Sequence, residues 1–323
     1  METSSPQLER ARVASAIRGI YLLWKADGTE CRATPIKNIS DSPAVGDWVN
    51  YDPLTTFIHE IEPRKTTLVR KKVGRATEQQ VIAANVDVMF IVMALDSDFS
   101  IRRLERWLIV AEESGSTPVI VLNKSDVCDD IVLKLAEIDK ITQAPVVVMS
   151  AVDDATVTQL SRFMEPGQTG ALLGSSGVGK STIINALLGH AQQPTMPVRE
   201  QDSKGRHTTT FRAMFRLTQG WILIDMPGIR ELEPWASTEA VSTTFEDIEK
   251  LAKKCRFRDC THHDEPGCNV AKKADPERLA SFHKLYSEMD EQARKRRDKV
   301  GCKAVRQTLE THAKHWRNEG GDV

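Results

Sequence analysis

The sequence has no long apolar run and no excess of either charge. None of its apolar stretches approaches the roughly 18 residues that span a bilayer, and the first residues, METSSPQLERAR, lack the basic-then-apolar pattern of a secretory signal. With 44 Lys and Arg against 45 Asp and Glu, the formal net charge of -1 provides no global field for binding nucleic acid. We therefore expect a cytoplasmic protein with no membrane partner, and any contact with nucleic acid must come from local basic patches.

Cysteine is also scarce, with six in 323 residues. Disulfides are not expected in the cytoplasm, so a cluster of thiols there favours a metal. The cluster has the form Cys-x4-Cys-x-His-x5-Cys and comprises Cys255, Cys260, His262 and Cys268. Three thiolates and one imidazole can close a tetrahedral zinc site with no open position, which predicts a structural zinc ion. His263 is a competing ligand by position, and we expect ordinary thiols at Cys31, Cys128 and Cys302.

The length of the chain suits several domains, each with its own core. Up to about residue 72, short strands alternate with turn residues, as in IRGIYLLW, TECRATPI, AVGDWVNYD and TTFIHEIEP. A five-stranded barrel of the oligonucleotide-binding (OB) type is one economical interpretation, and a half-sandwich is another. Trp48, Tyr51 and Phe57 are either platforms for stacked bases or, more commonly for alternating strand positions, core residues.

From about Val86 the pattern changes to apolar runs separated by helical segments. We expect strands at VDVMFIVMAL, TPVIVLN, APVVVMS, GALLG and WILIDMP, and helices at IRRLERWLIVAEES, IVLKLAEIDK and KSTIINALLG. This alternation predicts an α/β domain with a mostly parallel sheet that helices cover on both faces. After about Val241 the sequence is helical again around the cysteine cluster.

A phosphate-binding loop follows the run GALLG and opens a helix. The sequence GSSGVGKS fits the pattern G-x-x-x-x-G-K-[ST], and consists of Gly174, Ser175, Ser176, Gly177, Val178, Gly179, Lys180 and Ser181. The glycines let backbone N–H groups surround phosphate oxygens, and the helix N-terminus adds its positive end. Lys180 is expected to neutralise the outer phosphates, and the Ser181 hydroxyl is expected to bind Mg²⁺.

The stretch NKSD, at the end of the run TPVIVLN, predicts which base is read. The Asp126 carboxylate can accept two hydrogen bonds from the N1–H and the amine of guanine, and adenine offers neither donor in that arrangement. Ser150 and Ala151, at the end of APVVVMS, can supply a backbone N–H to the guanine O6. Taken alone, NKSD is also compatible with a surface turn, and Ser-Ala has almost no specificity.

A third group of residues points to the terminal phosphate. In DMPG, Asp225 can hold Mg²⁺ through water and the Gly228 N–H can bond the γ-phosphate. The stretch GRHTTT lies between this motif and the phosphate loop, and one of its threonine hydroxyls can reach Mg²⁺; alone it would be a plain threonine-rich loop. Ile229 occupies the position where many GTPases have a glutamine, so we expect slow intrinsic hydrolysis and consider His207 as the group that orients water. The alternative for His207 is packing within its loop.

These motifs together make a GTPase set in which the base readers precede the phosphate loop. All ligand loops of a parallel sheet lie at the carboxyl ends of its strands, so a circular permutation of the chain leaves the pocket unchanged. The order therefore indicates a circularly permuted GTPase.

With its motifs VGDWV, NKSD, GSSGVGKS, GRHTTT, DMPGIRE and CRFRDCTHHDEPGC, the sequence resembles the RsgA (YjeQ) family of circularly permuted GTPases along nearly its whole length. The resemblance implies an OB-fold RNA-binding domain over residues 1–75, a GTPase domain over 76–238 and a helical zinc domain over 239–323. It implies guanine recognition by Asn123, Lys124 and Asp126, phosphate binding by residues 177 to Thr182, and a switch threonine at Thr209, with Thr208 and Thr210 as neighbours.

The same resemblance implies that GTP is hydrolysed to GDP with stimulation by the 30S ribosomal subunit, in late maturation of that subunit and in contact with 16S rRNA, by a protein expected to be a monomer. Two basic runs, residues 62–75 and 294–299, are either RNA-binding or solvated faces. A GTP-gated RNA-binding scaffold with negligible turnover is the main alternative. A P-loop ATPase or kinase is a weaker one, because Asp126 discriminates against adenine.

Overall fold

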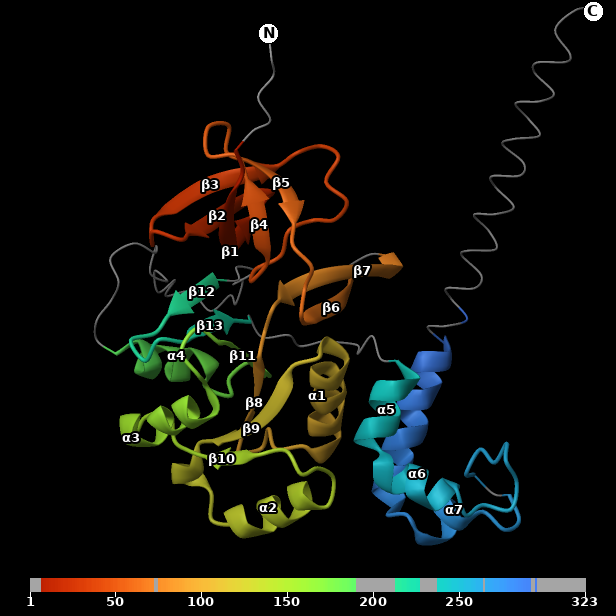
Figure 1. The fold of residues 1–323 in the computed structure, drawn as a ribbon. Helices are drawn as coiled ribbons and strands as arrows, with labels where there is room; N and C mark the ends of the chain where they lie inside the picture. The colour runs from red at the N-terminus through yellow and green to blue at the C-terminus, as the bar shows by residue number, and fades with distance from the viewer. Residues whose placement is uncertain are drawn as a thin grey trace, which may run out of the picture.

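The computed structural model describes residues 7–72, 75–189, 213–226, 237–263, 265–291 and 294. From top to bottom, Figure 1 shows a small barrel of strands, a central sheet with helices, and a group of helices beside the central sheet. None of the described helices is long and apolar enough to cross a membrane.

The N-terminal strands form a closed barrel. Its strands are β1 (Glu9–Ile17), β2 (Ile20–Lys25), β3 (Glu30–Pro35), β4 (Trp48–Tyr51) and β5 (Phe57–Ile61). They are hydrogen-bonded in the order β1-β2-β3-β5-β4, and β4 pairs back onto β1. The expected five-stranded OB-type barrel is thus confirmed, because a half-sandwich would leave this sheet open. Tyr51 is 2 % exposed and packs in the barrel core with Val13, Leu23 and Ile58.

Strand β1 was not among the expected strands, because a buried arginine interrupts its apolar pattern. Arg12 is only 5 % exposed. Its guanidinium donates to the backbone oxygens of Gly46 and Asn85, and to the Thr169 hydroxyl of the central sheet at 2.7 Å. Burial lowers the pKa of Arg12 to about 10, which leaves the side chain charged at neutral pH. The Arg12 guanidinium therefore links the barrel to the central sheet by hydrogen bonds.

The central domain is a sheet with helices on both faces. A separate hairpin of β6 (Thr67–Lys72) and β7 (Arg75–Ala84) leads into it from the barrel. The strands of the central sheet are β8 (Val88–Ala94), β9 (Thr117–Asn123), β10 (Val146–Val148), β11 (Thr169–Gly174), β12 (Ala213–Arg216) and β13 (Ile222–Asp225). Their order is β10-β9-β8-β11-β13-β12, parallel except for β12. The expected α/β fold with a mostly parallel sheet is confirmed.

Alternate residues of the buried strands face opposite layers of helices. In β8, Met89, Ile91 and Met93 pack with the helices α1 (Ile101–Ser114) and α2 (Ile131–Asp139). Phe90 and Val92 pack on the other face with α3 (Asp154–Val157), the 3₁₀ helix η2 (Thr158–Phe163) and α4 (Lys180–Leu188). This alternation follows from the period of two in a strand, and burial on both faces accounts for the continuous apolar runs in the sequence.

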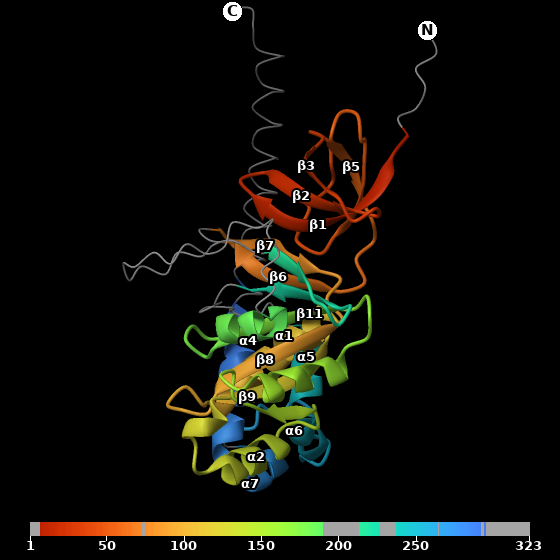
Figure 2. The ribbon, with the colours of Figure 1, turned by 90° about the vertical axis from the view of Figure 1, so that its left-hand side faces the viewer.

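The barrel and the central sheet are continuous. Ser15 of β1 pairs with Ala213 of β12, which joins the two parts into one sheet of 11 strands. Next to this pairing the Arg216 guanidinium lies 4.4 Å from the ring centroid of Trp24 in β2. Trp24 also belongs to the same buried core as Met214. Figure 2 shows β12 lying below β1 and reaching the central sheet.

The C-terminal helices pack against α1. They are α5 (Thr238–Thr244), α6 (Glu246–Ala252), α7 (Asn269–Lys273) and the helical residues 276–291. Ile109 of α1 is buried in their core beside Val241, Phe245 and Phe282. A buried ion pair joins Glu105 of α1 to Arg278, whose guanidinium also bonds Asp247. Helix α1 therefore has one side on the central sheet and another on the C-terminal helices (Figure 1).

Candidate nucleotide-binding and metal-binding sites

Polar residues gather where the parallel strands end. Asn123 ends β9, Asp225 ends β13, and Gly174 ends β11. Ser150 follows β10, and Asp96 follows β8. Because the carboxyl ends of parallel strands lie at one edge of the sheet, this edge is where an open α/β sheet binds its ligands.

Asn123 joins three of the predicted motifs through one side chain that is 1 % exposed. Its Nδ2 donates to the Val178 carbonyl of the phosphate loop at 2.7 Å. Its Oδ1 accepts from the backbone N–H of Ala151 at 2.8 Å. The base-reading segment, the Ser150-Ala151 turn and the phosphate loop are thus held together although they lie far apart in the sequence.

The carboxylate expected to read guanine is oriented but open to solvent. Asp126 is exposed in the short 3₁₀ helix η1 (Ser125–Val127), and the Ser150 hydroxyl donates to its Oδ1. Thr156 holds the Ser150 backbone, because its Oγ1 accepts from the Ser150 N–H at 3.1 Å and donates to the Ser150 carbonyl at 2.8 Å. An ionised carboxylate presented in this way can accept the two donors of a guanine edge.

Lys124 has an acidic partner that no sequence motif indicated. Its Nζ lies 2.7 Å from Asp96 Oδ2 in an ion pair, and its backbone is left-handed with φ 64°. The hydrogen bond from Lys124 lowers the pKa of Asp96. The only available signal for Asp96 was its place just after a buried strand, which is a general position for ligand-binding residues.

The phosphate loop has the glycines that its geometry requires. Gly179 has φ 97°, and a Cβ on it would lie 2.2 Å from Asn123 Nδ2. A Cβ on Gly174 would lie 2.4 Å from the Val92 carbonyl oxygen. A side chain at Gly174 would require the backbone at the end of β8 to move, and a side chain at Gly179 would displace the Asn123 side chain.

The lysine of this loop is buried at the base of the loop. Lys180 is 8 % exposed, and its Nζ donates to the carbonyls of Gly174 and Ser175 at 2.6 Å each. Ser181 and Thr182 are exposed in the first turn of α4, where backbone N–H groups have no partner within the helix. The Lys180 ammonium and the N-terminus of α4 are groups that can bind nucleotide phosphates, and the Ser181 hydroxyl can bind a Mg²⁺ ion carried by those phosphates.

Part of the expected catalytic set lies outside the described residues. Asp225 is described: it is 6 % exposed and pairs with Leu172 of β11 and Ala213 of β12. His207, Gly228 and the threonines Thr208, Thr209 and Thr210 fall in segments that the structure does not describe. The roles predicted for them stay predictions.

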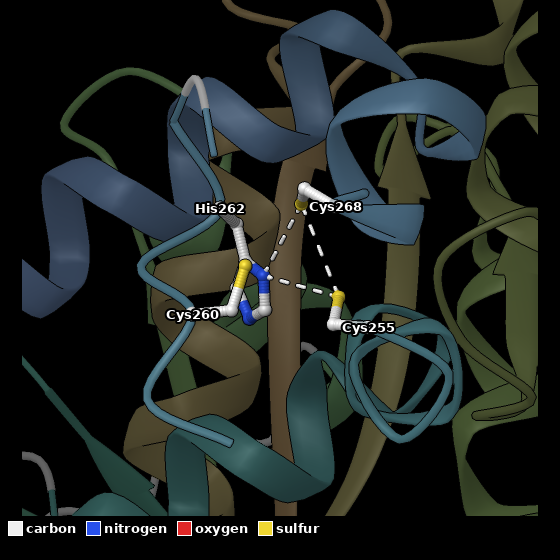
Figure 3. A group of neighbouring side chains, drawn as sticks. All are labelled: Cys255, Cys260, His262 and Cys268. Carbon is white, nitrogen blue, oxygen red and sulfur yellow. Dashed lines mark hydrogen bonds between the residues drawn. The ribbon is translucent and has the colours of Figure 1, made fainter. Parts of the chain in front are cut away.

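The cysteine cluster converges in three dimensions (Figure 3). The ligand atoms of Cys255, Cys260, His262 and Cys268 all lie within 4.8 Å of one another. Cys255 Sγ is 3.9 Å from Cys268 Sγ and 3.7 Å from His262 Nδ1. Zn–S bonds of about 2.3 Å in a tetrahedron place two sulfurs about 3.8 Å apart. The residues therefore fit a closed zinc site.

The surroundings of the cluster support the same ligand set. Backbone N–H groups donate to its sulfurs, from Asn269 to Cys255 at 3.3 Å and from Ala271 to Cys268 at 3.2 Å. The ring of His263 instead stacks on His283 with centroids 4.0 Å apart. Of the two histidines, the structure thus brings only His262 into the cluster.

In the first basic run, Arg64 and Arg70 both bond other residues of the fold, and Arg70 donates to Gln80 Oε1. Arg64 donates through Nε to Asp47 at 2.8 Å and through Nη1 to Asp41 at 2.6 Å. Asp47 is fully buried, so Arg64 is the counter-charge that it requires, and this guanidinium is committed to the barrel loop. Among the barrel aromatics, Trp48 is covered by the Arg10 guanidinium at 3.8 Å, and Phe57 is 44 % exposed.

Comparison with known proteins matches two family models, and one of them covers more than half of the chain. A family model described as RsgA GTPase matches residues 61–235, and one described as ABC transporter matches residues 157–315, which include the phosphate loop. The chain is 46 % identical over 283 residues to the small ribosomal subunit biogenesis GTPase RsgA of Opitutus terrae, covering 82 % of this chain and 77 % of that protein.

Two solved structures are similar in fold. YjeQ from Thermotoga maritima superposes with a TM-score of 0.63 at 25 % identity, over 87 % of this chain and 98 % of YjeQ. YloQ, described as a circularly permuted GTPase, superposes with a TM-score of 0.62 at 22 % identity, over 90 % of this chain and 98 % of YloQ.

Proposed function

Because this chain belongs to the RsgA GTPase family, we propose that it hydrolyses GTP to GDP and phosphate and that it acts in the biogenesis of the small ribosomal subunit. The observation that carries the proposal is the position of Asn123, whose amide bonds both the phosphate loop and the Ser150-Ala151 turn. A phosphate site and a guanine-reading site joined in this way bind one guanine nucleotide.

Each described residue of the site has a distinct part in this proposal. Asp126 accepts hydrogen bonds from the guanine edge, and the Ala151 N–H, which donates to Asn123 Oδ1, holds the Ser150 turn in place. The phosphate loop and Lys180 bind the phosphates. Ser181 and Asp225 would hold Mg²⁺, which offsets the negative charge that develops on the transferred phosphate. The proposal also assigns Thr209 to the switch, Gly228 to the γ-phosphate and His207 to the attacking water.

The cysteine cluster is proposed to hold one structural zinc ion. Its four ligands would be Cys255, Cys260, His262 and Cys268. The distances between their sulfur and nitrogen atoms support this assignment. A site closed by four protein ligands has no position for substrate. The zinc would therefore hold the loop between α6 and α7 in place and take no part in hydrolysis.

The finer parts of the proposal concern partners and organisation. We propose stimulation of hydrolysis by the 30S subunit, contact with 16S rRNA, and action as a monomer in the cytoplasm. The division into residues 1–75, 76–238 and 239–323 belongs to the same proposal. The name of the Opitutus relative, which states a role for that protein in small-subunit biogenesis, supports the subunit as partner.

Base recognition is tested by Asp126→Asn. The change replaces an acceptor oxygen with a donor amide facing the guanine N1–H and amine, so GTP affinity should fall by at least about a hundredfold. Xanthosine triphosphate, which offers an acceptor there, should become the better ligand. Competition against a fluorescent GDP by GTP, ATP and XTP measures both effects. Unchanged GTP affinity in a folded Asp126→Asn protein would reject this assignment.

A scaffold that holds GTP without turnover is distinguished by measuring phosphate release with and without 30S subunits. Release beyond one equivalent per protein marks an enzyme, and release of no more than one equivalent under both conditions marks a scaffold. The family relationship favours the enzyme.

A further inference from the structure

The segment from the end of β8 to the first turn of α1 contacts the proposed nucleotide site at two points. At its start, Asp96 pairs with Lys124 of the base-reading segment. At its end, Arg103 contacts Ser175 of the phosphate loop. Neither Asp96 nor Arg103 belongs to a nucleotide-binding motif of the sequence, so their part in the site rests on geometry.

Arg103 is held by several contacts in the first turn of α1. Its Nη1 donates to the Ser175 hydroxyl at 3.1 Å and to the Asp98 backbone oxygen at 3.1 Å. The same nitrogen donates to the Asp98 carboxylate, and the guanidinium lies 5.9 Å from the ring centroid of Trp107. Within the described part of the chain, the other carboxylate oxygen of Asp98 is buried without a hydrogen-bond partner. Arg103 is therefore the counter-charge that allows Asp98 to remain there.

The helix that carries Arg103 is also bonded to the C-terminal helices. Glu105 is 1 % exposed and bonds Arg278 and Ser281 of the C-terminal helices. Arg106 pairs with Glu288 of the same helices. Because α1 packs against the sheet as well, Arg103 projects from a rigid support toward the loop.

Ser175 is held twice, and only one of the two bonds depends on Lys180. Its carbonyl accepts from Lys180 Nζ, and its hydroxyl accepts from Arg103. The bond from Arg103 comes from a different element, α1, so it holds this part of the loop independently of what the Lys180 ammonium contacts. With glycines at 174, 177 and 179, the loop has much conformational freedom to lose on binding.

We infer that Arg103 is a positioning residue, which holds the phosphate loop through the Ser175 hydroxyl in the conformation that receives nucleotide phosphates. This inference rests on the proposed function, because it concerns the same nucleotide. Arg103 acts on the phosphate half of the site only, and the base-reading half is supported separately through Asp96 and Lys124.

The test compares Arg103→Ala with Arg102→Ala, a neighbouring exposed arginine on the same helical turn. Displacement of a fluorescent GDP by unlabelled GDP and by guanosine measures the two halves of the site. Because Arg103→Ala loses one charged hydrogen bond, its GDP affinity should be lower by about threefold to tenfold, and its guanosine affinity should be unchanged. Arg102→Ala should bind both ligands as the wild-type protein does. Arg103→Lys, which keeps a charged donor, should recover part of the loss.

A double-mutant cycle shows whether Arg103 acts through Ser175. If it does, Ser175→Ala weakens GDP binding, and adding Arg103→Ala to it causes no further loss. Fully additive losses, an equal loss for guanosine, or GDP affinity in Arg103→Ala equal to wild type would overturn the inference. If the wild-type protein itself does not bind GDP, the proposed function fails, and this outcome is distinct from the others.

Discussion

Asn123 and Gly179 depend on each other. The Asn123 amide can reach the Val178 carbonyl only because the next residue, Gly179, has no Cβ. Gly179 also has a positive φ of 97°, which costs other residues about 1–2 kcal/mol. Gly177 has a similar φ of 87°, but a Cβ on it would meet no atom within 4 Å.

This contrast predicts different stabilities for two alanine variants of the free protein. Gly177→Ala should lower the free energy of unfolding only by the cost of its positive φ. Gly179→Ala should lower it by about 2 kcal/mol more, because it also displaces the Asn123 side chain and breaks its two hydrogen bonds. Thermal unfolding without nucleotide should give a clearly lower Tm for Gly179→Ala. Equal Tm values would show that the loop relaxes freely and that Asn123 does not lock it.

Functional residues that lie close together in the sequence can be predicted from the sequence alone. The runs GSSGVGKS and NKSD each fit within eight residues, so their chemistry is visible without a fold. Asp96 and Arg103 act on residues that are 28 and 72 positions away. Their partners depend on how strands are ordered in the sheet, which no local pattern records.

Among the elements, buried runs were predicted well and polar strands were not. The expected helix IRRLERWLIVAEES coincides with α1, and the expected strand TPVIVLN coincides with β9. Strand β1 contains the buried Arg12, and β12 has only four residues, which is too short for a pattern. Strands β1 and β12 pair with each other at the junction between the barrel and the central sheet. In β1 the buried charge of Arg12, which is hydrogen-bonded to Thr169 of β11, interrupts the apolar pattern by which a strand is predicted.

The loop between α6 and α7 is the element that depends on metal. Binding by three thiolates and an imidazole supplies folding free energy, so removing a ligand should unfold the loop. Cys260→Ala is expected to lose its zinc and to become protease-sensitive between residues 255 and 268, while GDP still binds. The matched control is Cys128→Ala, a thiol remote from the cluster, which should retain one equivalent of zinc. A Cys260→Ala protein that stays metal-free and protease-resistant would show that zinc does not hold this loop.

In the whole molecule, the barrel and the C-terminal helices each contact the central domain next to the proposed nucleotide site. The barrel pairs with β12, the strand beside β13 and its terminal Asp225. The C-terminal helices bond α1, whose first turn carries Arg103. A partner that binds these outer parts is thus in a position to act on the nucleotide site.

We propose that the protein is a GTPase whose hydrolysis is stimulated by the small ribosomal subunit. Ile229 follows Gly228 in the sequence and can neither donate nor accept a hydrogen bond with its side chain, so the free protein should turn over slowly. The measurement is multiple-turnover phosphate release from GTP, with Mg²⁺, titrated with purified 30S subunits and with 50S subunits as control. We predict a rate that rises by orders of magnitude and saturates with 30S but not with 50S. A rate that is indifferent to 30S subunits would contradict the account.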